Sequence, residues 1–407
     1  MYWKAMSQAE YQAAVRAAVM HNLRYSQADV LGFPGSYLDR EIFPVEQFVE
    51  DHPYLHCLRE NPNHIGCHTL TESEHAFRGT QALEVDLIRI CAEEIAKAPS
   101  GGYDGYVATG GTECNIEAMW IFRNALAKEG FAPHELALIC SEDTHYSAHK
   151  AANLLGIDLI QAPVDEDSRQ MKPTALAEQI GNAKRAGKRA FVCILNMGTT
   201  MFGSIDDIDS FCAVLDGMDV EYRVHIDAAF GGFIYPFSTP QHRLDFRNPR
   251  VLSMTMDAHK MLQAPYGTGI FLCRKGLLAN VCTEAAAYVH GKDYTLCGSR
   301  SGAAAIAVWM ILQAYGSEGG VRFIQGLLAR TDRLCEGLSR LGISYFRAEG
   351  MNVVTMKATQ IPKEIAERFT LVPDRHEGTP RYWKAVVMDH VTEAMMDRFL
   401  SALAGSR

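Results

Sequence analysis

Two polar side chains that follow apolar runs have the types and positions needed to act together. Lys260 ends the sequence Asp-Ala-His-Lys at residues 257–260, and Asp227 lies within His-Ile-Asp-Ala-Ala at residues 225–229. A lysine amine forms a Schiff base with an aldehyde, and a nearby carboxylate keeps a pyridine nitrogen protonated. Lys260 and Asp227 together therefore predict a site for pyridoxal 5′-phosphate, which neither residue predicts alone.

The effect of Asp227 on such a ring would be electrostatic. At about 3 Å from a pyridinium, a carboxylate contributes on the order of 5 kcal/mol at an effective dielectric constant of about 20. An interaction of this size raises the pKa of the ring nitrogen by several units. The protonated ring can then act as an electron sink.

A glycine-rich turn precedes a helical pattern at residues 109–115, Thr-Gly-Gly-Thr-Glu-Cys-Asn. Glycine lets the backbone approach an anion closely, and a helix N-terminus offers unbonded N–H groups and the positive end of the helix dipole. Gly111 and Thr112 are therefore candidates to hold a phosphate. The alternative is an ordinary turn before a helix, which is the commoner use of such a pattern.

Two more polar residues follow apolar runs and could reach the same ligand. His145 could stack on a pyridine ring, although a capping or buried structural histidine is the alternative. Thr200, in Gly-Thr-Thr, could bond the ring's phenolic oxygen, or it could be a structural threonine in a loop. Open parallel sheets bind ligands beyond the carboxyl ends of their strands, so these segments are expected to converge on one cofactor.

Composition limits the kind of protein and its partners. The chain has 407 residues, 48% of them hydrophobic, and a net charge of -9 with interleaved acidic and basic residues. Nucleic-acid and anionic-membrane partners are therefore disfavoured. The first residues do not resemble a secretory signal, no stretch is apolar over the roughly 18 residues of a membrane helix, and 11 cysteines suggest free thiols. We expect a cytoplasmic protein.

The centre of the chain alternates short apolar runs with helical segments. The runs lie at residues 136–140, 190–195, 223–226 and 251–255. Continuous apolar strands between helices predict an α/β domain with a mostly parallel sheet covered on both faces. Ser204 and Asp207 are predicted to form a capping pair for one of these helices.

The pattern divides the chain into three parts. Residues 1–60 are expected to form an N-terminal arm, and residues 61–300 a large cofactor-binding domain. A long apolar helix from Ala303, a strand at residues 384–388 and a helix from Thr392 predict a small C-terminal α+β domain at residues 301–407.

Taken together, these segments resemble the group II pyridoxal phosphate-dependent decarboxylases, which have fold type I. The resemblance lies in residues 109–115, 144–147, 198–200, 225–232, 257–260 and 298–302, and it covers about residues 60–400. Residues 386–392 are similar to the last strand of the small archaeal-type tyrosine/aspartate decarboxylases.

The resemblance implies a homodimer with its active site at the subunit interface. It also implies the reaction, which is decarboxylation of an L-amino acid to its amine and CO₂ through a Lys260 aldimine and a quinonoid intermediate. The implied contacts of the cofactor are His145 stacked on the ring, Asp227 on its nitrogen, Ala229 beneath it, Thr200 at the phenolic oxygen, Gly111, Thr112 and His259 at the phosphate, and Gly298 and Ser299 from the other subunit.

The proton donor that completes the reaction is not marked by a motif. In the family it is usually a tyrosine on a mobile loop, but the segment at residues 275–296 is short. Tyr294 is our main candidate, with Tyr288 and His145 as others. Either tyrosine could instead simply pack at an interface.

Three alternative functions use the same fold. The first is another carbon–carbon lyase, similar to the phosphorylated-sphingoid-base lyases, which would need a second phosphate subsite. The second is transamination or desulfuration. The third is a non-catalytic binding protein, against which the intact Lys260 and Asp227 argue.

Two features carry less weight. His64, Cys67 and His68 resemble half a metal site, but the sequence offers no second half at a comparable spacing, so we expect no metal. These residues are expected to line the substrate entrance or the dimer interface. The substrate is not identified, since charged residues that could recognise it could equally be solvated, namely Glu72, Glu74, Arg78, Arg375 and Arg381.

Overall fold

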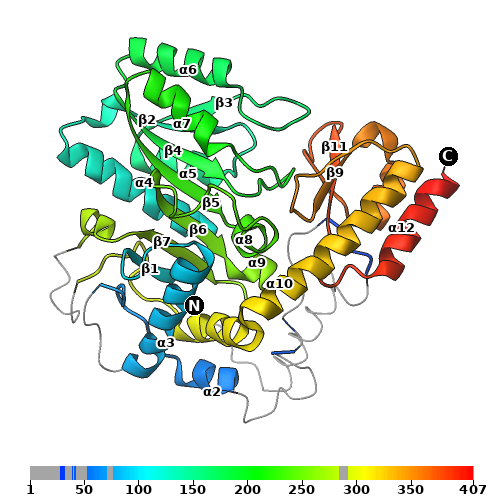
Figure 1. Cartoon of the computed structure of the whole chain (residues 1–407), viewed down its shortest axis with the longest axis horizontal. Coiled ribbons are helices and arrows are strands. Elements are labelled where there is room, and N and C mark those ends of the chain that lie inside the picture. Colours follow the sequence, from blue (N-terminus) through cyan, green and yellow to red (C-terminus); the bar gives the residue numbers. More distant parts are fainter. Residues whose placement is uncertain are drawn as a thin grey trace, which may run out of the picture.

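The computed structural model describes residues 28–32, 39, 41–42, 53–70, 77–283 and 292–406. Most of the expected N-terminal arm lies outside these ranges, as do Glu72, Glu74 and Tyr288. The described residues form a large sheet with helices on both faces and a smaller sheet beside it (Figure 1).

The large sheet has seven strands in the order β1-β7-β6-β5-β4-β2-β3. Neighbouring strands are parallel except that β7 is antiparallel to both β1 and β6. The mostly parallel sheet is therefore confirmed. The strands are β1 Tyr103–Ala108, β2 Leu136–Ser141, β3 Asp158–Ala162, β4 Ala190–Asn196, β5 Glu221–Ala228, β6 Val251–Asp257 and β7 Gly269–Arg274.

Both faces of this sheet are buried, which explains its apolar strands. Along β4, Phe191 and Cys193 belong to one apolar cluster, whereas Val192 and Ile194 belong to another. Successive side chains of a strand point to opposite faces, so each cluster marks one face. One face packs on α4 (Gly111–Lys128) and α5 (Ser147–Leu155). The other packs on α3 (Arg78–Arg89) with its π-helical extension η3 (Ile90–Ile95), and on α6 (Pro173–Arg185) and α7 (Ile208–Gly217).

The reversed direction of β7 follows from a short connection. Residues 258–268 join β6 to β7 and hold only the four-residue helix α9, Ala258–Met261. A parallel return would need a crossover of a dozen or more residues. The chain therefore turns back at the carboxyl end of β6, where Lys260 lies.

The start of α7 differs from the expectation. Asp207 is its N-cap and accepts hydrogen bonds from the backbone nitrogens of Asp209 and Ser210. Ser204 instead pairs with Thr199, with 2.7 Å between their hydroxyl oxygens. The predicted capping pair is therefore wrong by one turn, because a neighbouring loop already uses the Ser204 hydroxyl.

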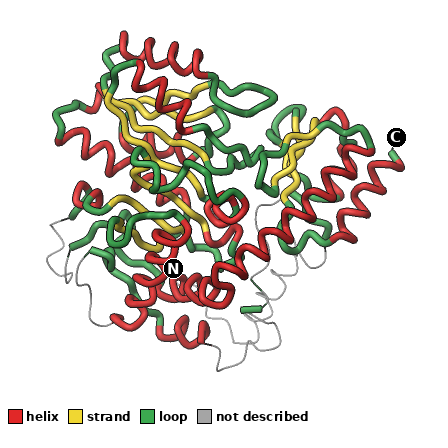
Figure 2. Tube along the Cα trace, viewed as in Figure 1, coloured by secondary structure: helices red, strands yellow, loops and turns green. Residues whose placement is uncertain are grey.

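The C-terminal part has a four-stranded antiparallel sheet in the order β10-β11-β9-β8. The long helix α10, Gly302–Arg340, runs from the large sheet to this small one and bends at Gly316, whose φ of 57° favours glycine. Figure 2 shows the two sheets as separate groups of strands. The remaining elements are α2 Pro53–Glu60, α8 Tyr235–Ser238, β8 Tyr345–Phe346, β9 Val353–Lys357, α11 Lys363–Arg368, β10 Val372–Pro373, β11 Tyr382–Val386 and α12 Glu393–Gly405.

The start of α12 agrees with the sequence prediction. Thr392 caps the helix by accepting from the backbone nitrogen of Met395. None of the described helices combines the length and the apolar character that crossing a bilayer requires.

Candidate active site

A cavity of about 320 Å³ lies at the carboxyl ends of the parallel strands. The loops after β1, β2, β4, β5 and β6 all contribute to it, as expected for an open α/β sheet. The described residues that line it are Thr109, Gly110, Gly111, Thr112, Glu113, Asn115, His145, Tyr146, Asn196, Gly198, Thr199, Thr200, Asp227, Ala229, Phe230, Asp257, His259 and Lys260. The sequence motifs for the ring, the phosphate and the lysine are thus brought together.

Lys260 enters the cavity from the short helix after β6. Its Nζ lies 3.2 Å from Oδ2 of Asp257, and Nε2 of His259 lies 3.5 Å from the same oxygen. Burial lowers the pKa of His259 below its ordinary value, although the charge of Asp257 opposes this. The amine is therefore held at the cavity wall by a carboxylate that is only 4% exposed.

Asp227 is the penultimate residue of β5 and is 7% exposed. Its Oδ1 accepts from the backbone nitrogen of Ala229 at 3.1 Å, and its Oδ2 accepts from Nδ2 of Asn115 at 2.8 Å. Each carboxylate oxygen can accept two hydrogen bonds. Asp227 is therefore fixed in place and keeps acceptor capacity for a ring N–H.

The phosphate candidate is the N-terminus of α4. Gly110 is its N-cap and has no side chain that could accept from the helix. The first backbone N–H groups of α4, which have no partner within a helix, are therefore not capped by this residue. A Cβ on Gly111 would lie 2.9 Å from Oδ2 of Asp257 and 3.1 Å from Cβ of Ala229, so a larger residue would force these neighbours to shift. Glu113 turns back to accept from Thr109 at 2.8 and 2.6 Å.

His145 follows β2 and lines the cavity beside Tyr146, with 4.0 Å between the two ring centroids. Its Nδ1 lies 3.0 Å from Oγ of Ser147. Burial lowers the pKa of His145, and the charge of Asp227 only partly opposes this. The ring is therefore held in its neutral form over a wider pH range than a free histidine.

Three residues implied by the family resemblance lie outside this cavity. Gly298 and Ser299 do not line it, and the Ser299 hydroxyl instead accepts from Nδ2 of Asn63 at 3.1 Å. Tyr294 packs against the apolar cluster of α4 and α5. Their roles stay predictions that depend on a second subunit.

Lys384 is a candidate that sequence reasoning missed. It lies on β11, is 2% exposed, and donates from Nζ to the backbone oxygen of Thr200 at 2.9 Å. Burial and then the charge of Lys260 lower the pKa of Lys384 to about 8. A lysine inside an apolar strand was the available signal, because unpaired lysines are rarely buried.

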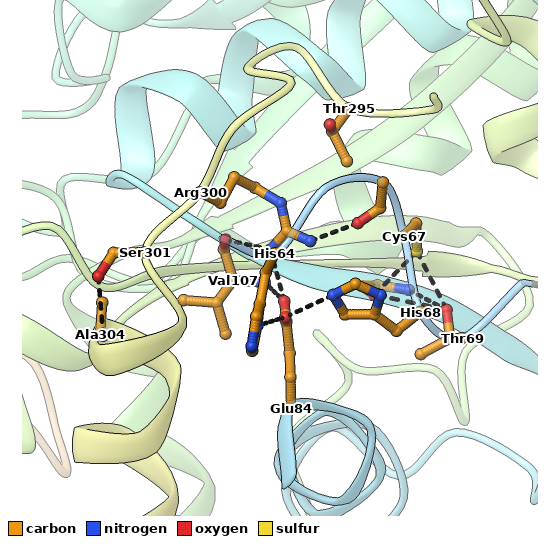
Figure 3. A network of polar contacts seen from close by, with 12 residues as sticks. His64, Cys67, His68, Thr69, Glu84, Val107, Thr295, Arg300, Ser301 and Ala304 are labelled. Carbon is orange, nitrogen blue, oxygen red and sulfur yellow. Dashed lines mark hydrogen bonds and ion pairs between the residues drawn. The ribbon is translucent and has the colours of Figure 1, made fainter. Parts of the chain in front are cut away.

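His64 and His68 do find a third polar group, contrary to the sequence expectation. Nδ1 of His64 lies 2.5 Å and Nε2 of His68 lies 3.2 Å from the same oxygen of Glu84, which comes from α3 (Figure 3). Cys67 instead contacts Thr69. The ligand types could hold a metal ion. The site is buried behind β1 and does not line the cavity.

The charge of Arg300 argues against a cation at Glu84. Nη1 of Arg300 lies 2.5 Å from the other oxygen of Glu84. Burial alone would raise the pKa of Glu84, but Arg300 and the two histidines hold it well below its usual value. Since the carboxylate is already neutralised, a divalent ion would add uncompensated buried charge, so we interpret this cluster as structural.

Comparison with known proteins identifies the family. Residues 70–342 match the family model described as the pyridoxal-dependent decarboxylase conserved domain. The chain belongs to this family. A protein of Clostridium sporogenes (strain ATCC 15579) named tryptophan decarboxylase is 45% identical over 392 residues, which cover 96% of this chain and 94% of the relative. This chain is therefore a pyridoxal phosphate-dependent amino acid decarboxylase.

The expected likeness to archaeal enzymes is also confirmed. A protein of Methanosarcina barkeri (strain Fusaro / DSM 804) named probable L-tyrosine/L-aspartate decarboxylase is 30% identical over 341 residues, covering 80% of this chain and 84% of the relative. The identity is lower than with the Clostridium protein, so the archaeal likeness does not by itself indicate the substrate.

Solved structures share the fold. The L-methionine decarboxylase of Streptomyces sp. 590 superposes with a TM-score of 0.76 at 19% identity, covering 98% of this chain and 95% of the other. The sphingosine-1-phosphate lyase of Burkholderia pseudomallei has a TM-score of 0.78 at 18% identity, covering 100% and 92%. The lyase alternative therefore shares the architecture, and the family assignment decides in favour of decarboxylation.

The cavity fits pyridoxal phosphate, the cofactor of this family. The uncapped start of α4 can accept a dianion, and Asp227 keeps acceptor capacity at the opposite side. Oδ1 of Asp257 and Nδ1 of His259 are buried polar atoms of the lining without a hydrogen-bond partner among the described residues. Such atoms are expected where a polar ligand completes the site.

Proposed function

We propose that this decarboxylase acts on an aromatic L-amino acid, with tryptophan as the first candidate. The observation that carries the proposal is Tyr146, which lines the cavity beside His145 and is 59% exposed. Phe230 adds a second aromatic ring to the lining, and none of the described lining residues is an arginine that would pair with a substrate side-chain carboxylate. The name of the Clostridium relative supports the same substrate class.

The residues of the cavity divide the work on the ring. Lys260 would hold the cofactor aldehyde covalently, and Asp227 would accept a hydrogen bond from the ring nitrogen. His145 would cover one face of the ring while Ala229 packs against the other. When bound, the cofactor supplies a protonated ring that draws electrons from the bond broken as CO₂ leaves.

The remaining contacts would anchor the phosphate and the phenolic oxygen. The backbone N–H groups of Gly111 and Thr112 would bind the phosphate, with His259 beside them. The Thr200 hydroxyl would bond the phenolic oxygen. This arrangement places the anion at the helix N-terminus and the ring nitrogen at the carboxylate, so the two ends of the cofactor meet opposite charges.

Lys384 is proposed as the cation that attracts the substrate carboxylate. Its ammonium lies against the backbone oxygen of Thr200, a lining residue, and close enough to Lys260 to lower the pKa of Lys384. A carboxylate entering the cavity would relieve the repulsion between the two cations. The carboxylate would then leave as CO₂ from a position set by Lys384.

A homodimer would complete the site. The cavity of one chain is not lined by Gly298, Ser299 or the candidate proton donor Tyr294 of the same chain. We propose that the segment that holds these residues serves the partner's cavity. Co-expression of Lys260→Ala and Tyr294→Phe chains tests this, because only hybrid dimers would then contain a complete site. Inactive hybrids would contradict the arrangement.

We also propose a division of the chain into domains and a cellular compartment. We keep residues 61–300 as the large domain and 301–407 as the small one, since α10 begins at Gly302. All 11 cysteines are free thiols, most of them buried. Free thiols support a reducing compartment such as the cytoplasm.

The substrate class is tested with purified enzyme and a panel of L-amino acids. Tryptophan, tyrosine, phenylalanine, aspartate, glutamate and methionine are supplied separately, and product amines and CO₂ are measured by mass spectrometry. The proposal expects tryptamine at the highest kcat/KM. A preference for aspartate or methionine would contradict the substrate class while leaving the family assignment intact.

A further inference from the structure

Asn115 lines the cavity and lies at the centre of a buried chain of hydrogen bonds. Its Nδ2 donates to Oδ2 of Asp227 at 2.8 Å and to Oγ of Ser147 at 2.9 Å. Its Oδ1 lies 2.9 Å from Nε2 of His225. Asn115 is 1% exposed, so solvent does not compete for these bonds. One amide therefore joins α4, β5 and the start of α5.

The direction of these bonds follows from Asp227. An ionised carboxylate only accepts, so the amide nitrogen of Asn115 must face it and the amide oxygen must face His225. Nε2 of His225 therefore carries a hydrogen. Burial lowers the pKa of His225 to about 4, and Nδ1 of this neutral ring accepts from Oγ of Ser253 at 2.8 Å. The orientation of Asn115 is thus fixed from both sides.

Ser147 extends the chain to His145. Because the Ser147 hydroxyl accepts from Asn115, its own hydrogen is directed to Nδ1 of His145, 3.0 Å away. The backbone nitrogen of Ser147 also donates to this Nδ1 at 3.3 Å. Nδ1 is therefore an acceptor, and the hydrogen of the neutral ring lies on Nε2.

We propose that Asn115 is a positioning residue that joins Asp227 to His145 through Ser147 and holds the His145 ring as its Nε2–H tautomer. Since Nδ1 is bonded to Ser147, Nε2 is the nitrogen left for a ligand, and the ring presents a hydrogen-bond donor. A donor there suits a negative oxygen such as that of the substrate carboxylate. The inference rests on the proposed function, because Asp227 and His145 act on the cofactor only in that proposal.

Two variants separate the links of this chain. Asn115→Leu removes all three side-chain hydrogen bonds of Asn115 at similar volume, whereas Ser147→Ala removes only the hydroxyl that joins Asn115 to His145. Asn248→Leu is the matched control, because Asn248 is also buried and donates to the backbone oxygen of Arg243 outside the cavity. If Asn115→Leu does not fold, Ser147→Ala still tests the link to His145.

The readout is the tautomer of His145, measured by nitrogen NMR of histidine-labelled protein with and without cofactor. The His145 signals are assigned by their loss in a His145→Gln variant. We expect the Nε2–H form in the wild type and in Asn248→Leu. Ser147→Ala and Asn115→Leu keep the backbone N–H of Ser147 as a donor to Nδ1 but lose the directed hydroxyl, so we expect a smaller fraction of the Nε2–H form in both. An Nδ1–H wild type, or an unchanged tautomer in both variants, would overturn the inference.

Cofactor affinity distinguishes the two links further. Asn115→Leu should bind pyridoxal phosphate about tenfold more weakly, because Asp227 loses one charge-assisted bond. Ser147→Ala should leave this affinity unchanged. Equal losses of affinity in the two variants would contradict the proposed order of the chain.

Failure of the proposed function would be seen separately. A wild-type protein that binds no pyridoxal phosphate would overturn the roles of Asp227 and His145. The tautomer in cofactor-free protein would still be measured, and it would decide whether Asn115 positions the ring.

Discussion

Glu84 and Arg300 form a buried ion pair that ties three segments of the fold together. Nη1 of Arg300 lies 2.5 Å from Oε1 of Glu84 and 2.8 Å from the backbone oxygen of Val107. The backbone nitrogen of Val107 donates to the same Oε1 at 2.8 Å. The pair thereby joins α3, β1 and the segment before α10. Because β1 leads directly into the turn at Gly110, the pair also supports the phosphate end of the cavity.

Loss of one partner of this pair should strongly destabilise the protein. Arg300→Met leaves the Glu84 carboxylate buried without its cation, which is expected to cost about 3–5 kcal/mol of unfolding free energy. Urea unfolding followed by circular dichroism measures the loss. Arg340→Met is the control, because Arg340 and Glu336 form an exposed pair at 3.9 Å and should contribute little. Equal stability of the two variants would contradict the role of Arg300.

The local parts of the site could be predicted from the sequence. Lys260, Asp227 and Gly111 each follow an apolar run within a short motif, and parallel strands bring such positions to one edge of the sheet. The burial of both sheet faces was predictable for the same reason, since the strands are continuously apolar. These inferences depend only on neighbours along the chain.

The contacts that the sequence did not reveal join distant segments. Glu84 meets His64 and Arg300, and Lys384 meets Thr200, only because the fold brings separate elements together. The spacing of residues along the chain carries no information about such pairs. The direction of β7 was hidden for a similar reason, since an apolar run is the same in a parallel or an antiparallel strand.

Removal of the Lys260 amine should abolish covalent cofactor binding. Lys260→Ala is expected to lose activity by on the order of a thousandfold or more, because Lys260 is the only lysine among the described residues that line the cavity. Mass spectrometry after borohydride reduction measures the cofactor attached to the chain. Lys172→Ala, at a half-exposed surface ion pair, should retain the attached cofactor. Attachment in Lys260→Ala would mean that another lysine carries the cofactor.

Lys384 should make stability depend on pH in an unusual direction. Its pKa is about 8 in the folded protein against an ordinary value of 10.5. Between these values the unfolded chain holds the proton and the folded chain does not, so the unfolding free energy rises with pH. The difference between wild type and Lys384→Met should therefore shift in favour of the wild type by at most about 3 kcal/mol across this window. Urea unfolding of both proteins at each pH measures it, and a shift in the opposite direction would contradict a buried, charged Lys384.

The same residue should also set the pH dependence of substrate binding. As pH rises through about 8, Lys384 loses its charge, and KM for the amino acid should increase. Lys384→Arg keeps a positive charge throughout this range, so its KM should stay flatter above pH 8 even if its absolute value differs. Steady-state kinetics at fixed cofactor saturation make the comparison. Identical KM profiles of the two enzymes would remove Lys384 from substrate binding.

Tyr146 should decide how well aromatic substrates bind. Its ring lines the cavity and is largely exposed, so an aromatic substrate would cover it and gain ring contact. Tyr146→Ala is expected to raise KM for tryptophan by up to about tenfold, the upper range for one aromatic pair. Tyr146→Phe keeps the ring and should stay near wild type, which separates stacking from a role of the hydroxyl. Tyr222→Ala controls for a general loss of stability, because the hydroxyl of Tyr222 bonds Asp216 away from the cavity. If Tyr146→Phe loses as much as Tyr146→Ala, the hydroxyl and not the ring is the contributing group, and the aromatic substrate class loses its main structural support.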